Sequence, residues 1–140
     1  AATVKHFVCN NKETNRMYSD SRVSERALRE IYLKGFETAL KKSAPYAVMT
    51  SYNKMNGRYT SENAGLLLGI LREEWNYGGL VMSDWWNKAD QVCEIAAGNN
   101  IRMPHGDCGE ILSALADGKI TRRDLEYNAK YVLEFILKLD

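Results

Sequence analysis

The sequence contains few prolines and no long apolar run, and these absences exclude several classes of protein. Its 2 prolines among 140 residues argue against a disordered, proline-rich linker. No apolar run approaches the roughly 20 residues that a membrane-spanning helix requires. Residues 1–6 also lack the basic stretch and the apolar core of a signal peptide. We therefore expect no membrane as a partner of this chain.

Cysteine is scarce as well, and its positions give no metal or disulfide pattern. The 3 cysteines, Cys9, Cys93 and Cys108, are widely separated and odd in number. This usage is typical of free thiols in a reducing compartment, so a cytoplasmic location is slightly favoured and small buried thiols are expected. With His6 and His105 they form no zinc-ligand spacing, and no glycine-rich phosphate loop is present. We expect neither a metal nor an organic cofactor.

Charge is nearly balanced, with 19 basic and 18 acidic residues and a net charge of +1. A chain of this kind produces no strong electrostatic field, so nucleic acid is not an expected partner. The length of 140 residues favours one compact unit, residues 1–140. A unit of this size buries roughly two-thirds of the surface that the unfolded chain exposes.

Four short apolar runs alternate with segments of helical periodicity. The runs cover residues 4–9, 46–52, 80–83 and 101–103. This alternation predicts an α/β fold with four parallel strands and crossover helices. A flavodoxin-like layer and about half of a TIM-type (β/α)8 barrel both fit, because four strands do not close a barrel of eight.

Helices are expected at about residues 61–75, 88–97 and 108–117, and from Thr121 onward. Asn56-Gly57 predicts a tight turn, and Thr121 with Asp124 predicts a capping box. A further helix precedes Pro45, and its buried stripe is expected to comprise Leu28, Ile31, Tyr32, Phe36 and Leu40. The inward residues of the last helix are expected to be Leu125, Ala129, Val132, Leu133 and Ile136.

Polar and aromatic residues gather where the predicted strands end. Lys5 and His6 lie in the first run, Tyr52 ends the second, and Asp84-Trp85 follows the third. Ligands of α/β proteins bind beyond the carboxyl ends of parallel strands, where the loops converge. Sugars suit these side chains, because their hydroxyls bond to polar groups and their C–H faces pack on aromatic rings. Taken alone, Asp84 fits a helix N-cap as well as a catalytic carboxylate.

An ordered set of motifs then resembles one known family. Lys-His-Phe at residues 5–7, Met-Thr-Ser-Tyr-Asn at 49–53 and Ser-Asp-Trp at 83–85 are followed by Met-Pro at 103–104. In this order they resemble the barrel domain of family 3 glycoside hydrolases, from its middle to its end. The resemblance covers nearly the whole chain. It implies the C-terminal half of the α/β barrel of a β-glucosidase-like enzyme.

The resemblance implies a role for Asp84 as the nucleophile of a retaining glycosidase. In that mechanism one carboxylate attacks the sugar, and a second protonates the departing oxygen and later activates water. The implied substrate is a β-glucoside or a short β-linked oligosaccharide that loses its terminal non-reducing glucose. The implied contacts to the sugar come from Lys5, His6, Met49, Tyr52 and Trp85.

The acid/base is not identified in this sequence. Residues 8–13 lack the Asp-Ser-His signature of the N-acetylglucosaminidase-like branch, which favours the β-glucosidase-like branch, whose acid usually belongs to a second domain. Glu13 is the nearby carboxylate worth testing as a stand-in, while Arg16, Arg22, Glu25 and Arg26 are expected in surface ion pairs. The missing barrel half and the second domain are thus expected partners.

Two consequences follow for the chain by itself. With a second carboxylate and half a barrel missing, we expect it to be inactive alone. An incomplete parallel sheet exposes edges and apolar faces, so self-association is also expected. The alternative is a non-catalytic α/β module that binds sugar or serves as a scaffold for other chains.

Overall fold

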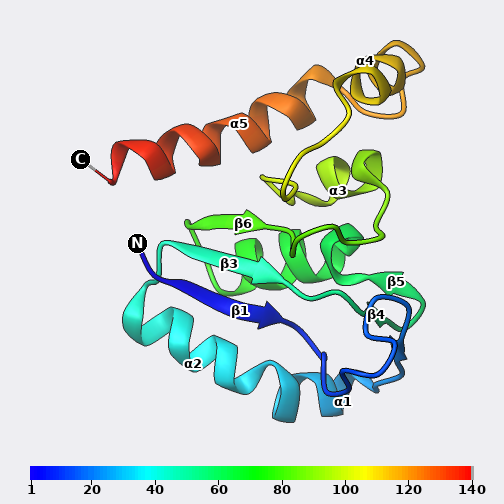
Figure 1. Cartoon of the computed structure of the whole chain (residues 1–140). Helices are drawn as coiled ribbons and strands as arrows, with labels where there is room; N and C mark the ends of the chain where they lie inside the picture. The colour runs from blue at the N-terminus through cyan, green and yellow to red at the C-terminus, as the bar shows by residue number, and fades with distance from the viewer. Residues whose placement is uncertain (140) are drawn as a thin grey trace.

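A three-stranded parallel sheet forms the centre of the computed structural model, which describes residues 1–139 (Figure 1). Its strands lie in the order β1 (Thr3–Phe7), β3 (Ala47–Thr50) and β6 (Leu80–Met82). Both pairings are parallel. The predicted α/β class with parallel strands is confirmed. Strands β3 and β6 lie within the second and third predicted runs, and β1 begins one residue before the first.

The predicted fourth strand is reduced to a single bridge. Ile101 pairs in parallel with Met82, and no named strand follows among residues 101–107. The backbone N–H of Met103 donates instead to the Ser83 hydroxyl, at 2.9 Å. Pro104 has no N–H to donate, so the ladder cannot continue past this point. The expectation of four strands is therefore wrong for this chain.

Helical segments connect the strands. Between β1 and β3 run α1 (Glu25–Ala27), the π-helical η1 (Leu28–Tyr32) and α2 (Lys34–Ser43). Between β3 and β6 run the 3-10 segment η2 (Thr60–Glu62) and the π-helical η3 (Gly65–Glu74). The side chains between the sheet and these segments form one core, which includes Phe7, Val8, Leu33, Val48, Leu66, Leu67, Leu71 and Val81.

The stripe predicted for the first helix is correct except at Ile31. Leu28 and Leu40 are buried, but Ile31 is 67% exposed. The cause is the π-helical turn, in which the Leu33 N–H bonds to the Leu28 carbonyl at 2.8 Å. This wider i→i+5 turn rotates Ile31 to the solvent side and brings Leu33 into the core instead.

A second, small sheet lies beyond the carboxyl ends of the main strands. It comprises β2 (Asp20–Ser21), β4 (Lys54–Met55) and β5 (Arg58–Tyr59), none of which the sequence predicted. The turn between β4 and β5 is the predicted Asn56-Gly57, with φ angles of 50° and 89°. These left-handed values are those that a two-residue hairpin turn requires. The Ser21 hydroxyl ties this sheet to the Cys9 carbonyl, at 2.8 Å.

Three helices complete the chain: α3 (Gln91–Ala97), α4 (Cys108–Ala116) and α5 (Arg122–Leu137). The predicted capping box of Thr121 and Asp124 is present. Helix α3 starts later than predicted, because Asp90 caps it and accepts from the Cys93 N–H at 2.9 Å. Within residues 1–139, no helix combines the length and the apolar character needed to cross a membrane.

Two burial predictions fail in the C-terminal part. Helix α5 lies at the outer end of the molecule, beyond β6 and α3 (Figure 1). Only part of its apolar surface is covered there, so Ala129, Leu133 and Ile136 are exposed although Leu125 and Val132 are half-buried. The expectation of buried thiols is confirmed for Cys9 and wrong for Cys93 and Cys108, which are exposed.

Candidate active site

The carboxyl ends of the three main strands converge on Asp84. The register pairs Val4 with Val48 and Val48 with Val81, so the strands end at one edge of the sheet. His6 lies near the end of β1, and Asp84 lies two residues past the end of β6. The polar groups that follow these strands therefore meet at this edge, as the parallel arrangement predicts.

Asp84 is a buried carboxylate with one oxygen fixed and the other facing an imidazole. The residue is 7% exposed. Its Oδ1 accepts from the Trp85 backbone N–H at 2.8 Å, and its Oδ2 lies 3.6 Å from His6 Nε2. Asp84 caps no helix, because the next helix begins at Gln91 with Asp90 as its cap. The N-cap interpretation of Asp84 is therefore excluded.

Tyr52, two residues past the end of β3, supports the same carboxylate. Its hydroxyl donates to the Trp85 carbonyl at 2.8 Å, which fixes the backbone next to Asp84. Burial and the negative charge of Asp84 both raise the pKa of the Tyr52 phenol above its ordinary value. The phenol therefore stays protonated and able to donate a hydrogen bond.

Arg16 joins this group although the sequence placed it in a surface ion pair. Its guanidinium carbon lies 4.7 Å from the centroid of the Tyr52 ring. Its Nη1 also bonds to Glu13 at 2.7 Å, in the ion pair that was expected. Glu13 itself is highly exposed, with 70% of its side-chain surface accessible. No local motif marks Arg16, because its contact with Tyr52 spans 36 positions of the sequence.

Two adjacent tryptophans stand beside Asp84. Trp85 is 42% exposed and Trp86 is 60% exposed, and their ring centroids lie 5.5 Å apart. Trp86 adopts a left-handed backbone conformation with φ of 54°. Exposed aromatic faces of this kind can pack against the apolar face of a sugar ring. A contact with the sugar was predicted for Trp85 but not for Trp86.

Lys5 and Met49 are less closely connected to Asp84. Lys5 is exposed, and within residues 1–139 no ion pair joins it to the Asp84 carboxylate. Met49 is buried in β3, where it pairs with Met82. The structure thus brings His6, Tyr52 and Trp85 to Asp84, and it places the other two predicted residues on the neighbouring strands.

Ser83 holds the loop that carries Asp84. Its backbone N–H donates to the Ile101 carbonyl at 2.9 Å, and its hydroxyl accepts from Met103 N–H at 2.9 Å. The Trp86 N–H donates to the Met103 carbonyl at 3.0 Å. These three bonds join the residues on both sides of Asp84 to the segment 101–103. Ser83 belongs to the Ser-Asp-Trp motif, but its anchoring role was not predicted.

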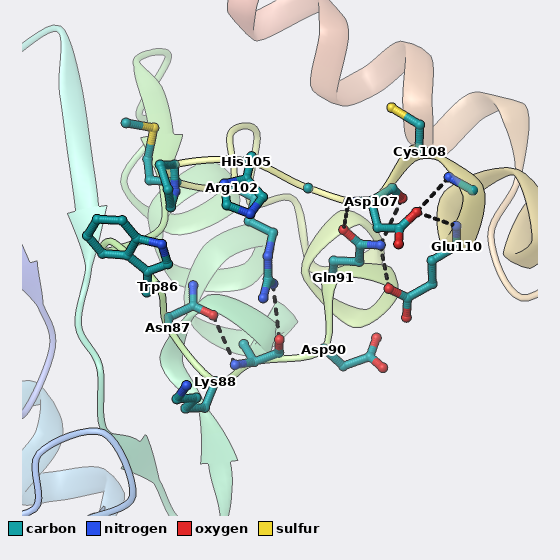
Figure 2. A pocket seen from close by; sticks show the side chains of 15 residues that line it. Trp86, Asn87, Lys88, Asp90, Gln91, Arg102, His105, Asp107, Cys108 and Glu110 are labelled. Carbon is teal, nitrogen blue, oxygen red and sulfur yellow. Dashed lines mark hydrogen bonds between the residues drawn. The ribbon is translucent and has the colours of Figure 1, made fainter.

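A cavity of about 680 Å³ has Trp86 in its lining (Figure 2). Asp84 does not line it. The part of the chain described here contains no cluster of three or more His, Cys, Asp or Glu side chains able to hold a metal ion. The side chains that line the cavity include Trp86, Lys88, Asp90, Gln91, Arg102, His105, Asp107 and Glu110.

Comparison with known proteins gives a consistent result. The family model described as the glycosyl hydrolase family 3 N terminal domain matches residues 1–135. Beta-glucosidase A of Butyrivibrio fibrisolvens is 50% identical over 125 residues, which are 89% of this chain and 15% of that protein. An exo-alpha-(1->6)-L-arabinopyranosidase of Bifidobacterium longum is 42% identical over 97% of this chain and 18% of its own length.

Solved structures agree with these relatives. Beta-glucosidase 3B of Thermotoga neapolitana, in complex with glucose, superposes with a TM-score of 0.93 and 47% identity. The match covers 96% of this chain and 20% of that structure. The chain therefore spans a fifth or less of the length of these proteins.

Proposed function

This chain belongs to glycoside hydrolase family 3, and on that premise we propose that it supplies part of the active site of a retaining β-glucosidase. Proteins named beta-glucosidase are 50% and 44% identical to it over most of its length. The reaction would release terminal non-reducing β-D-glucosyl residues from a β-glucoside or a short β-linked oligosaccharide. The observation that carries the proposal is the buried Asp84 carboxylate beside His6 and Tyr52.

Asp84 is the nucleophile in this proposal. Its Oδ1 is held by the Trp85 N–H, which leaves Oδ2 free to attack the anomeric carbon. Attack forms the bond between Oδ2 and the anomeric carbon as the bond to the departing oxygen breaks. The acid that protonates the departing oxygen lies about 5–5.5 Å from the nucleophile in retaining enzymes. It comes from a segment outside residues 1–140.

The neighbouring groups bind the sugar that reacts. His6 lies 3.6 Å from Oδ2, within reach of a hydroxyl that the carboxylate also contacts. Tyr52 keeps its proton and fixes the Trp85 carbonyl, while the Trp85 ring forms a wall of the subsite. Lys5 and Met49 complete the sugar contacts from β1 and β3. Arg16, stacked on Tyr52, is added to this set as a positioning residue.

The chain acts as a piece of a larger barrel in this proposal. Its three strands and the bridge at Ile101 correspond to about half of a (β/α)8 barrel, its C-terminal half. Beyond Ile101 on one side and β1 on the other, no further strand pairs with this sheet among the described residues. The remaining strands and a second domain would close the barrel and supply the acid/base.

The test uses a completed enzyme, in which this chain replaces the matching fifth of the Thermotoga neapolitana β-glucosidase 3B. We expect the completed enzyme to hydrolyse an aryl β-glucoside and the 140-residue chain alone to show no activity. Asp84→Asn should lower turnover by at least about a thousand-fold while glucose still binds, because it removes the attacking oxyanion but little volume.

Two results would contradict the proposal. Hydrolysis by the isolated chain would show that the acid/base lies within it. Glucose binding without turnover in the unsubstituted completed enzyme would favour the alternative, a sugar-binding or scaffold module that has no nucleophile.

A further inference from the structure

The loop 84–90, which joins Asp84 to helix α3, is held at its far end by a carboxylate from another part of the chain. At the start of this loop, the Tyr52 hydroxyl donates to a backbone carbonyl next to Asp84 at 2.8 Å. At its end, the Asp90 backbone N–H donates to Oε1 of Glu62 at 2.5 Å. This second bond does not cap α3, because the Asp90 side chain already caps that helix.

The segment that carries Glu62 is itself firmly anchored. Glu62 ends η2, and the two residues before it, Thr60 and Ser61, are 0% and 1% exposed. The Thr60 hydroxyl donates to the Ser51 carbonyl at 2.7 Å and accepts from the Ser51 N–H at 3.2 Å. Ser51 directly follows β3 and directly precedes Tyr52. Both bonds to the loop therefore originate from the end of one strand.

The ionised form of Glu62 is disfavoured where it lies. Burial raises the pKa of the Glu62 carboxyl above its ordinary value, and the charges of Asp90 and Glu94 add to this effect. The bond from the Asp90 N–H and the charge of Arg58 act in the opposite direction. A charged side chain held against burial and like charges is typical of functional sites. Its bond to the loop is the contact that accounts for its position.

We propose that Glu62 is a positioning residue for the nucleophile, which holds the end of the loop 84–90 and thereby sets where the Asp84 carboxylate lies. The inference rests on the proposed β-glucosidase function and deepens it. The link to the carboxylate is the Trp85 N–H, which belongs to this loop and binds Oδ1 of Asp84 at 2.8 Å. His6 lies on β1 instead, so its contact with the sugar does not depend on Glu62.

The experiment compares Glu62→Met and Glu62→Gln in the completed enzyme. Both side chains resemble Glu in length, but only Gln keeps an oxygen that can accept from the Asp90 N–H. Attack requires the reacting atoms to be aligned at about 3–3.5 Å, so Glu62→Met should lower kcat/KM for an aryl β-glucoside about ten-fold. The inhibition constant of glucose should stay unchanged, because the groups that bind the sugar are intact. Glu62→Gln should restore most of the loss.

The rates are referred to active sites, counted from the dinitrophenolate that 2,4-dinitrophenyl 2-deoxy-2-fluoro-β-glucoside releases, so that misfolded protein does not contribute. Glu73→Met is the control, because Glu73 is an exposed carboxylate on η3, and it should change neither constant.

Three results would overturn this inference. They are full kcat/KM in Glu62→Met, an inhibition constant of glucose that rises as much as kcat/KM falls, and a Glu62→Gln variant as impaired as Glu62→Met. Failure of the proposed function has a different sign, since the unsubstituted completed enzyme would then not hydrolyse the aryl glucoside.

Discussion

The carboxylate of Glu94 lies 2.5 Å from Nη1 of Arg102, and only 2% of its side-chain surface is exposed. The amide of Asn87 donates to the other carboxylate oxygen of Glu94 at 2.7 Å. Arg102 also donates to the Ala89 carbonyl at 3.0 Å. The pair thus joins α3 to the loop 84–90, which carries Trp86, and to the segment 101–103, whose Met103 carbonyl accepts from the Trp86 N–H.

Removal of the guanidinium should destabilise this region strongly. Arg102→Met leaves the buried Glu94 charge with Asn87 as its remaining partner. A buried charge without its counter-ion costs about 3–5 kcal/mol, so we expect the free energy of unfolding to fall by about 3 kcal/mol. Urea unfolding of the completed enzyme, followed by tryptophan fluorescence, measures the change.

The second substitution identifies the cause. Glu94→Gln in the Arg102→Met background removes the unpaired charge and should recover part of the lost stability. Arg122→Met serves as the control, because Arg122 pairs with Glu126 on the exposed surface of α5 and should cause no measurable change. If Arg102→Met behaved like this control, the pair would have no structural importance.

The strands and their ends could be predicted because their signals are local. The runs that became β1, β3 and β6 are apolar segments, and polar residues follow each of them directly. Parallel pairing then places His6, Tyr52 and Asp84 at one edge of the sheet without further information. The hairpin at Asn56-Gly57 was predictable for the same reason, since the turn residues themselves prefer the left-handed conformation.

The errors occurred where burial depends on distant contacts. Ile31 has the spacing of a core residue, but the π-helical turn moves it outward. Arg16 is charged, as surface residues commonly are, and its position over the Tyr52 ring results from the fold of residues 10–19. The apolar residues Leu133 and Ile136 indicate a buried helix face, and their exposure reflects what covers α5 in this chain. Periodicity predicts which side is apolar and does not show what covers it.

The three cysteines should differ in reactivity. Cys9 is buried, and burial raises the pKa of its thiol from 9.0 to about 11, whereas Cys93 and Cys108 are exposed. Burial and the charge of Asp90 also raise the pKa of Cys93. We expect a disulfide reagent at pH 8 to modify Cys108 first, Cys93 more slowly and Cys9 only after unfolding, because the thiolate is the reactive form.

The raised pKa of Cys9 also has a consequence for stability. The pKa of the Cys9 thiol in the folded protein, about 11, exceeds its ordinary value of 9.0. The contribution of Cys9 to the free energy of unfolding is therefore present in full below pH 9 and is lost as the pH rises through about 11. Cys9→Ser is the comparison variant in a pH series of urea midpoints. Rapid modification of Cys9 in the native protein at pH 8 would contradict the burial on which both expectations depend.

The role of Asp84 as nucleophile, and not as acid/base, can be tested by chemical rescue. Asp84→Gly removes the carboxylate whose Oδ2 lies 3.6 Å from His6 and leaves space on that side of the sugar. With 2,4-dinitrophenyl β-glucoside, whose leaving group needs no proton, azide should enter this space and restore turnover. The bond from azide to the anomeric carbon forms as the bond to the phenolate oxygen breaks.

The configuration of the product decides between the two roles. One displacement from the side of the missing nucleophile inverts the anomeric carbon and gives α-glucosyl azide, which proton NMR distinguishes from the β form. If Asp84 were the acid/base, the glucosyl-enzyme would still form on another carboxylate, and azide would give the β product after two displacements. Asp117→Asn removes an exposed carboxylate that pairs with Lys119 and should need no rescue. A β product from Asp84→Gly would therefore show that another carboxylate is the nucleophile, although Asp84 is the buried carboxylate that lies beside His6.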